Sequence, residues 1–422
     1  MEEINYKPTG KTIFIWNILG SLSNSLLSMI TLMLVTRILD NNRTDIFSIA
    51  WSISQLMATI GTFQIRTYQA TDVKEHFKFG QYFRFRIISI IAMMACSLGY
   101  ILIKNYDMYK GSIVLIICLF RAEDSLADVY EGYFQQKERL DLAGKAVTYR
   151  IIIAVSIFSI SLFLLKNLLV ACLALLISYI VSFFIFNVRY LIRINRLKIK
   201  ESWNQNKKWI FDLAKEGFPI FINAFLMMAI TNAPKMKIDS AISVGELANG
   251  TQTIFNILFM PASVLTLAYI VFRPLLTKMA IAWTNKEKKK FLKIIFLMVI
   301  CLVIMAIILL MGSALIGIPI LSFLYAISLK NYKIELLVMI IGGCFCTFSY
   351  VLDNALIVIR KQYLLVCSYL ATWVYIESVV SIFTNRWGLL GAALSYATSM
   401  MVFFFVTLLI FFICLKKEDT NE

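Results

Sequence analysis

The sequence predicts an all-α, polytopic membrane protein with about twelve transmembrane helices. Hydrophobic residues fill 60% of the 422 positions and the mean hydropathy is +0.77, values at which a soluble protein would aggregate. A bilayer core about 30 Å thick needs roughly 20 apolar residues per helical crossing, and runs of this length recur along the whole chain. The first run, near residues 12–36, is too long for a removable signal peptide, so we expect it to stay as a transmembrane helix.

The basic residues indicate a membrane topology and argue against a nucleic-acid partner, although the formal charge is +16. With the N-terminus assigned to the inside, the inner segments together hold 30 of the 41 Lys and Arg residues, the outer connections hold 10, and Arg121 is the last. The inner segments are 1–11, 64–86, 135–150, 189–215, 273–293, 360–361 and 416–417. The positive-inside rule then predicts a multi-pass protein of the cell (plasma or inner) membrane with both termini in the cytoplasm. The number of helices is then even.

Catalytic, metal and cofactor sites are not predicted. All eight cysteines lie in apolar runs without a CxxC pair, as expected of small core residues. The single histidine, His76, lies in an inner loop of mixed charge, where a solvated surface residue is the simplest interpretation. Zinc chemistry and serine-hydrolase chemistry therefore lack their usual groups.

Polar side chains form stripes on the first two helices. The first helix carries Asn17, Ser21, Asn24, Ser28 and Thr31 at spacings of three and four, and the second, near 45–63, carries Ser48, Ser52, Gln55 and Thr59. Small polar residues allow close packing and hydrogen bonds between membrane helices. The same stripes would also suit the wall of a polar cavity, and both interpretations stay open.

The most unusual stretch is the charged end of the helix expected at 111–133. At about 100° per residue, Arg121, Asp124, Asp128 and Glu131 share one face, whereas Glu123 falls on another. Ionised groups exposed to hydrocarbon are costly, so this face must look into a bundle, a water-filled cavity or the interface.

The connection 189–215 holds eight basic residues interleaved with apolar ones and is the expected boundary between two halves. We therefore divide the chain into an N-terminal bundle of six helices (1–188), a cytoplasmic basic linker (189–215) and a C-terminal bundle of six helices (216–422).

The seventh helix contains Pro219 and Pro234, and we expect a proline there to break its hydrogen-bond ladder. Asn232, Lys235 and Asp239 share a face of this helix. Alternatively, Lys235 and Lys237 only extend to the outer interface from the helix end. The eighth helix is expected to carry a third polar stripe, formed by Glu246, Asn249, Gln252, Thr253 and Asn256.

Several segments together resemble a known family. They are 64–74 with Phe79-Gly80 and Tyr82-Phe83, the run 121–132 leading to Arg139-Leu-Asp141 and Gly144-Lys145, and Asn232-Ala-Pro-Lys235 with Ile238-Asp239. They resemble the polysaccharide-biosynthesis flippases, the oligosaccharidyl-lipid branch of the multidrug/oligosaccharidyl-lipid/polysaccharide superfamily, which also contains the MATE exporters. The resemblance covers essentially the whole chain.

The resemblance implies two six-helix bundles around a central cavity. It also implies transport of undecaprenyl-diphosphate-linked oligosaccharide from the inner to the outer leaflet by alternating access. The partners would be this lipid-linked substrate and the bilayer, together with glycosyltransferases and a polymerase of a polysaccharide pathway. Twelve helices, where the lipid II flippases have fourteen, make a peptidoglycan precursor a poorer substrate.

Candidate residues follow from this function. A diphosphate needs cationic partners, and the candidates are Arg66, Arg121, Lys235, Lys237 and Arg273. A glycan needs amide and hydroxyl walls, and the candidates are Asn24, Gln55, Asn232, Asn249, Gln252 and Asn256. The candidates for an ion-coupling site or a lock between the bundles are Asp124, Asp128, Glu131, Asp239, Glu246 and Asp353. Arg121 would not serve a diphosphate if Asp124 and Asp128 neutralise it.

Two alternatives remain. A cation-coupled multidrug exporter of the same superfamily would need a cavity dominated by carboxylates and aromatic residues. A membrane glycan polymerase or ligase would need a large outer loop or a constellation of His, Asp and Arg, whereas the outer connections are short and the longest expected one is only the segment 313–334. A purely structural protein would not need continuous polar stripes.

Overall fold

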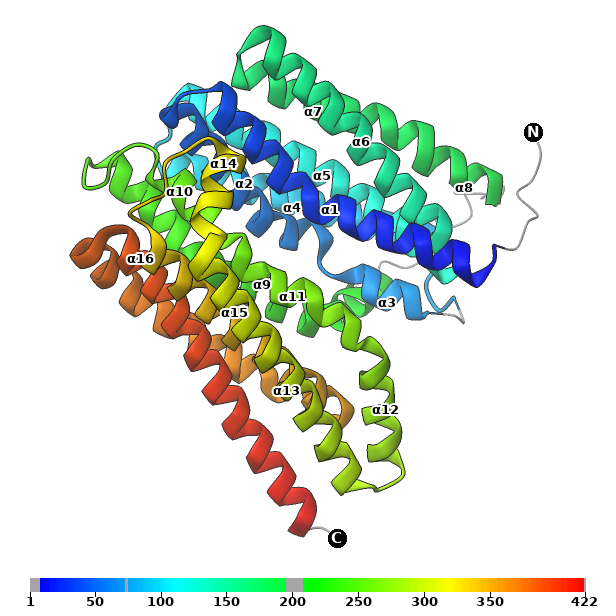
Figure 1. The fold of residues 1–422 in the computed structure, drawn as a ribbon. Coiled ribbons are helices and arrows are strands. Elements are labelled where there is room, and N and C mark those ends of the chain that lie inside the picture. The colour runs from blue at the N-terminus through cyan, green and yellow to red at the C-terminus, as the bar shows by residue number, and fades with distance from the viewer. Residues whose placement is uncertain (1–7, 73–74, 195–207, 421–422) are drawn as a thin grey trace. The chain divides into compact units, whose positions relative to one another are not determined.

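The computed structural model describes residues 8–72, 75–194 and 208–420, and these residues are almost entirely helical, without a strand (Figure 1). The expected all-α class is confirmed. The chain divides into two compact units, Met1–Phe225 and Leu226–Glu422. Residues 195–207, the central part of the predicted basic linker, lie outside the described residues.

The first unit contains eight α-helices and the beginning of a ninth within the described ranges. They are α1 (Gly10–Ile38), α2 (Asn41–Thr62), α3 (Ile65–Thr71), α4 (Phe79–Ile103), α5 (Met108–Gln136), α6 (Leu140–Leu165), α7 (Leu168–Phe183), α8 (Arg189–Ile194) and the start of α9 (Lys208–Ser243). A π-helical turn, η1 (Phe184–Val188), joins α7 to α8.

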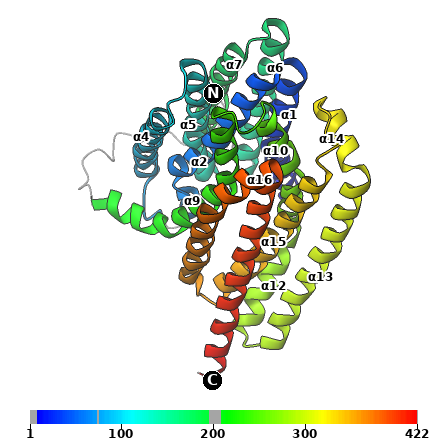
Figure 2. The ribbon, with the colours of Figure 1, turned by 90° about the vertical axis from the view of Figure 1, so that its left-hand side faces the viewer.

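The second unit continues from α9 through shorter helices to three long ones. They are α10 (Thr251–Phe259), η3 (Pro261–Ser263), α11 (Val264–Ala268), η4 (Tyr269–Phe272), α12 (Arg273–Thr284), α13 (Lys288–Gly312), η5 (Ser313–Gly317), α14 (Ile318–Tyr325), α15 (Lys333–Val358), η6 (Gln362–Leu364) and α16 (Leu365–Thr420). In both ribbon views α15 lies beside α16 (Figure 2).

Eight helices of the described chain are long and apolar enough to cross a membrane, or nine if α2 and α3 form one span bent by 43°. The sequence predicts about twelve spans. Two features explain part of the difference: charged side chains within one long helix, and two helices that form one continuous element. Helix α5 is 29 residues long but carries a cluster of charged side chains in its second half. The 56-residue α16 contains two helices that meet at Gly388, whose φ of 56° and ψ of −129° are not helical.

Short capped turns separate the helices of the first unit. The side chain of Asp40 accepts a hydrogen bond from the backbone N–H of Arg43 at the start of α2. Asp107 does the same for the first N–H groups of α5, and Asn167 for those of α7. Asp and Asn are favoured at this position because the first N–H groups of a helix have no partner within it. In these three turns the sequence stops one helix and starts the next within two to four residues.

Helices α1 and α6 pack backbone against backbone where two glycines meet. A Cβ atom on Gly144 would lie 2.2 Å from the carbonyl oxygen of Trp16, and one on Gly20 would lie 3.1 Å from the Cα of Gly144. Small residues allow such close approach between membrane helices. This contact places the polar stripe of α1 against α6.

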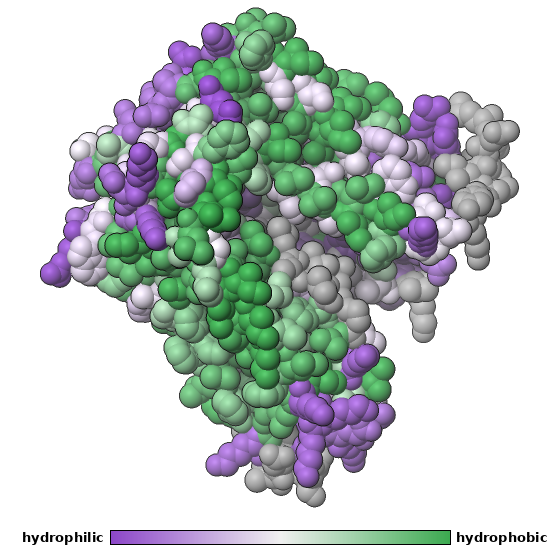
Figure 3. Space-filling model, viewed as in Figure 1, coloured by the Kyte–Doolittle hydropathy of each residue, from purple (hydrophilic) through white to green (hydrophobic). Residues whose placement is uncertain are grey.

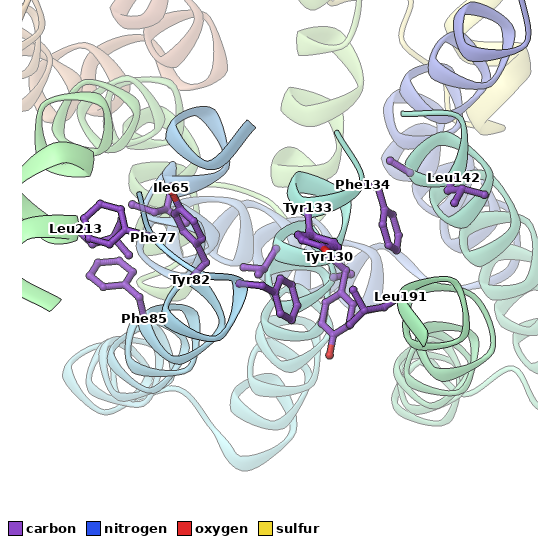
Figure 4. Close-up of a cluster of buried hydrophobic side chains, with 14 of the residues drawn as sticks. Ile65, Phe77, Tyr82, Phe85, Tyr130, Tyr133, Phe134, Leu142, Leu191 and Leu213 are labelled. Atoms are coloured by element: carbon purple, nitrogen blue, oxygen red, sulfur yellow. The ribbon is translucent and has the colours of Figure 1, made fainter. Parts of the chain in front are cut away.

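A largely aromatic cluster of buried side chains packs around α3, α4 and α5 in the first unit, with further members from α6, α7, α8 and α9 (Figure 4). Tyr82, Phe134 and Leu213 in it are fully buried. Beside the cluster, Asp72 accepts hydrogen bonds from the backbone N–H groups of His76 and Phe77 and from the Tyr82 hydroxyl. Burial raises the pKa of Asp72, but these hydrogen bonds outweigh it, and the net pKa is below its usual value. These contacts attach Asp72, at the C-terminal end of α3, to residues 76–77 and to α4.

Three local expectations for the second half are wrong. Helix α9 runs without a break through Pro219 and Pro234. Glu246 and Asn249 precede α10 in a turn and do not extend a helical stripe. The outer segment 313–334, expected as a loop, begins with η5 and α14, which prolong α13 into one span, Lys288–Tyr325.

The surface of the described chain is apolar over most of the helices. Figure 3 shows hydrophilic residues gathered near helix ends, including the end where α12 meets α13. Large apolar side chains such as Phe163, Phe296 and Phe323 are mostly exposed. Such a surface needs lipid as its solvent, which agrees with the composition.

Candidate functional site

The charged face of α5 meets arginines from three other helices, all in the first unit. Arg66 on α3 places its Nη1 atom 3.0 Å from Asp128 and 2.9 Å from Glu131. Arg86 on α4 lies 2.8 Å from the other oxygen of Asp128 and also donates to the carbonyl oxygen of Gly61. The acidic residues of α5 are therefore held by long side chains from its neighbours.

Arg150 on α6 contacts three carboxylates of α5, two of them new and the third Glu131 again. It lies 2.8 Å from Glu123, 3.2 Å from Glu131 and 3.5 Å from Asp124, and its guanidinium stands 4.2 Å above the ring of Tyr179. The expectation that Glu123 stands apart from the acidic face is wrong. Glu123 and Glu131 are only about 80° apart around the helix, and one guanidinium spans that arc.

Arg121 is the fourth arginine of this group, and it is a weak partner for a diphosphate. It lies 3.5 Å from Asp124 and 4.8 Å from the ring centre of Trp51. Asp124 in turn accepts a hydrogen bond from the Tyr179 hydroxyl. The positive charge of Arg121 is thus shared with a carboxylate and aromatic faces.

These eight side chains form what we call the α5 network. Its members are Arg66, Arg86, Arg121, Arg150, Glu123, Asp124, Asp128 and Glu131. Four positive and four negative charges cancel, which is the condition under which charges can be buried at a tolerable cost. The network therefore explains how α5 carries its charges inside an apolar unit.

Sequence reasoning missed Arg86 and Arg150 as members of this group. Both were counted as inner-loop charges, but both side chains are 0% exposed. A signal was present, because each is the last charged residue before a long apolar run, and ionisable residues at the edge of a membrane-spanning segment often have a function or a partner. Their partners could not be named without the helix packing.

The polar stripe of α1 lines a cavity of about 130 Å³ in the first unit, which we call the α1 cavity. Its polar walls come from Asn17, Ser21 and Asn24 of α1, together with Arg66 and Glu131 of the network. The stripe of α2 behaves differently. Ser52 and Thr59 are buried and donate to carbonyl oxygens of their own helix, as in a packing surface. Gln55 is half-buried.

A second cavity of about 390 Å³, the α3 cavity, opens beside α3. It is lined by Thr62, Gln64, Arg66, Thr67, Ala70, Thr71, Asp128 and Gln135. Arg66 lines both cavities, and its two carboxylate partners are divided between them, with Glu131 in the α1 cavity and Asp128 in the α3 cavity.

In the second unit, Lys235 on α9 is buried without a carboxylate within ion-pair distance among the described residues. Its Nζ atom lies 4.6 Å from the ring centre of Phe259 on α10. Asn232, one turn earlier, donates to the carbonyl oxygen of Met228, and its own side-chain oxygen is buried without a partner in the described part of the chain. Gln252 is fully buried, and both ends of its amide lack a partner among the residues that the structure describes.

The remaining candidates are spread over the second unit. Asp353 on α15 accepts a hydrogen bond from Tyr369 at 2.9 Å, and its other oxygen is buried with no partner among the described side chains. Asp239 is buried, whereas Lys237 and Asn256 are half-buried. Glu246 and Asn249 are exposed in the turn before α10, and the side chain of Arg273 lies outside the described residues. No group of three metal-ligating side chains occurs in the described ranges.

The sequence matches the polysaccharide biosynthesis protein family over residues 12–280, more than half of the chain. The chain belongs to this family. It is also similar to the capsular polysaccharide biosynthesis protein CapF of Staphylococcus aureus, with 25% identity over 328 residues that cover 75% of this chain and 79% of CapF. The resemblance drawn from the motifs is confirmed at the level of the family.

The fold of this family member is that of the MATE transporters. An inward-facing multidrug resistance MATE transporter of the MOP superfamily aligns with a TM-score of 0.72 and 12% identity, covering 93% of this chain and 96% of the other. A variant of the Vibrio cholerae MATE transporter VcmN aligns with a TM-score of 0.64 and 10% identity, covering 96% and 97%. The protein is therefore a multi-pass membrane protein of a transporter fold.

Proposed function

We propose that this protein is a flippase that carries undecaprenyl-diphosphate-linked oligosaccharide, the repeat unit of a cell-surface polysaccharide, from the inner to the outer leaflet by alternating access. Membership of the polysaccharide biosynthesis family and the similarity to CapF support a substrate from this chemistry. The transporter fold supports transport as the role of the chain. The cell membrane, with both termini in the cytoplasm, is the proposed location.

The observation that carries the proposal is the α1 cavity. Amide and hydroxyl groups of Asn17, Ser21 and Asn24 line it next to the guanidinium of Arg66. Sugar hydroxyls need such donors and acceptors, and a diphosphate needs a cation, so one cavity offers both kinds of partner. An apolar unit has no structural need for this combination.

Among the proposed diphosphate partners, the geometry favours Arg66 and Lys235. Arg66 is partly exposed in two cavities, and Lys235 has no carboxylate partner among the described side chains. Arg121 is paired within the α5 network. Of the proposed glycan-wall residues, Asn24 lines the α1 cavity, and Asn232 and Gln252 bring buried amides without full partners. Asp353 stays a proposed coupling residue, because one of its carboxylate oxygens is buried without a hydrogen-bond partner among the described residues.

A cation-coupled multidrug exporter is the second candidate, because the solved structures with this fold are MATE transporters. The α1 cavity argues against it. Three of its polar side chains are neutral, and its one carboxylate, Glu131, already contacts two arginines. A membrane polymerase or ligase is the third candidate, with less in the site to support it. Glycosyltransferases and a polymerase of the same pathway are proposed as partners.

The test uses cells depleted of this protein. Lipid-linked oligosaccharide is extracted after treatment with a glycan-modifying probe that cannot cross the membrane. A flippase predicts that the oligosaccharide accumulates and is shielded from the probe, and mass spectrometry then identifies its sugars. A normal outer pool with changed sensitivity to cationic drugs would contradict the proposal and favour the exporter. An abundant outer pool that is not polymerised would favour the enzyme.

A further inference from the structure

Arg66 differs from the other arginines of the α5 network in its access to the cavities. Arg86 and Arg150 are completely buried and line neither cavity, whereas the Arg66 side chain is 30% exposed and lines both. Both ion pairs of Arg66 use the single atom Nη1. Its Nε and Nη2 atoms therefore have no carboxylate partner among the described residues and are available to a ligand.

Both carboxylates that hold Arg66 have a second arginine in place. Asp128 is also bound by Arg86 at 2.8 Å, and Glu131 is also bound by Arg150 at 3.2 Å. If Arg66 turned away, neither carboxylate would be left as an isolated buried charge, which would be the costly outcome. The carboxylate partners of Arg86 and Arg121 are also shared with a second arginine, so access to the cavities is what distinguishes Arg66 within the network.

The backbone that carries Arg66 is fixed, so the exchange needs only a side-chain movement. Ile65 and Gln69 of α3 are fully buried, and Gln69 donates to the carbonyl oxygen of Val129 at 3.1 Å. Gly132 lies under α3 without room for a Cβ atom, since one would lie 2.4 Å from the Gln69 side chain. The long Arg66 side chain can therefore change partners while α3 stays against α5.

We infer that Arg66 is an exchangeable cation that leaves Asp128 and Glu131 to bind a phosphate group in the α3 cavity. A guanidinium binds phosphate oxygens with two parallel hydrogen bonds, and Thr67, Gln64 and Gln135 line the same cavity with further polar groups. The inference rests on the proposed function only in taking this phosphate as part of a lipid-linked diphosphate. In this arrangement the carboxylates of α5 compete with the ligand for Arg66.

Competition predicts opposite effects for two substitutions in one contact. Arg66→Gln removes the cation, so phosphate binding weakens. Glu131→Gln removes a competitor, so phosphate binding strengthens. Glu131→Gln is the suitable competitor variant because Arg150 keeps Glu123 at 2.8 Å and Asp124 at 3.5 Å, whereas loss of Asp128 would leave Arg86 without a carboxylate among the described residues.

The experiment measures binding of farnesyl diphosphate to the purified full-length chain in detergent, by calorimetry, with farnesol as the uncharged control. We expect Arg66→Gln to weaken binding by roughly tenfold or more and Glu131→Gln to tighten it by roughly threefold or more. Arg66→Lys should give an intermediate affinity, because an ammonium keeps the charge but loses the planar fork. Arg43→Gln, at an exposed pair with Asp40, is the matched control and should not change the affinity.

Size-exclusion elution and thermal unfolding of each variant establish that it is folded before binding is compared. Equal weakening by Arg66→Gln and Glu131→Gln would overturn the inference, because the pair would then act as one fixed structural unit. Unchanged binding in Arg66→Gln would also overturn it. Inorganic diphosphate is the second probe, and tighter binding of farnesyl diphosphate than of inorganic diphosphate assigns the site to a lipid-linked ligand.

The failure of this inference differs from the failure of the proposed function. A normal outer pool in depleted cells, together with Arg66-dependent diphosphate binding, would remove the flippase and keep the site. Accumulated shielded oligosaccharide, together with diphosphate binding that does not depend on Arg66, would keep the flippase and remove the site.

Discussion

At the scale of single residues, the α5 network explains how arginines exist inside an apolar unit. Arg86 and Arg150 are fully buried, and each carries a short contact to a carboxylate of α5. Charge pairing offsets part of the cost of removing ions from water, but only while both partners are present. Removing one partner is therefore the informative change.

Arg150→Met tests this account. The substitution leaves Glu123 without an arginine partner among the described residues, so we expect the free energy of unfolding to fall by about 3–5 kcal/mol. The measurement is thermal or denaturant unfolding of the purified protein in detergent. Arg43→Met, at the exposed pair with Asp40, should cost less than about 1 kcal/mol. Equal losses at the two positions would refute the buried network as a source of stability.

At the scale of helices, close approach depends on glycines that the hydrophobic pattern does not distinguish. Gly144 allows α6 to touch the backbone of α1 at Trp16. Gly343 on α15 has the same role, because a Cβ atom there would lie 2.3 Å from the carbonyl oxygen of Ala262. In both contacts the opposing atoms are backbone and cannot rotate away. The cavity wall formed by α1 depends on the first of these contacts.

Gly144→Ala is therefore expected to be destabilising. The new methyl group would overlap the Trp16 carbonyl and push α1 away from α6, at a cost of roughly 1–3 kcal/mol. Gly99→Ala is the matched control within α4, where an added Cβ meets nothing within 4 Å. Alanine there should raise stability by about 0.5–1 kcal/mol, because glycine weakens a helix interior. If both substitutions shifted the unfolding temperature in the same direction and by the same amount, the close-packing argument would be disproved.

At the scale of the whole molecule, the distribution of Lys and Arg predicts the orientation in the membrane. The positive-inside rule places both termini and the turn between α5 and α6 in the cytoplasm, and the turn between α6 and α7 outside. Glu138 and Lys166 are exposed residues in these two successive turns, both with left-handed backbone angles. They form a natural pair of reporters.

Cysteine labelling in intact cells measures this orientation. Lys166→Cys should react with a membrane-impermeant maleimide, and Glu138→Cys should react only after the cells are permeabilised. Peptide mass spectrometry separates these sites from the native cysteines. A fluorescent protein that matures only in the cytoplasm should be bright when fused after Glu422. The reverse labelling pattern would invert the topology.

The candidate site was only partly predictable. Helical spacing correctly grouped Asp124, Asp128 and Glu131, because a face of α5 depends on the helix alone. The same spacing excluded Glu123, and the loop count hid Arg86 and Arg150, because their pairing depends on which helices lie beside α5. Likewise, the stripes of α1 and α2 look alike in sequence, but one lines a cavity and the other is buried in packing.

The sequence by itself determined that the chain is a helical membrane protein, where most helices lie, and which family it belongs to, because hydropathy, charge bias and motifs are local properties. Only the tertiary structure decided that Arg66 meets Asp128 and Glu131, and that Asn24 shares a cavity with Arg66 and Glu131. These residues come from α1, α3 and α5. Their meeting depends on contacts such as Gly144 against Trp16, whose effect is set by the distance between two helices.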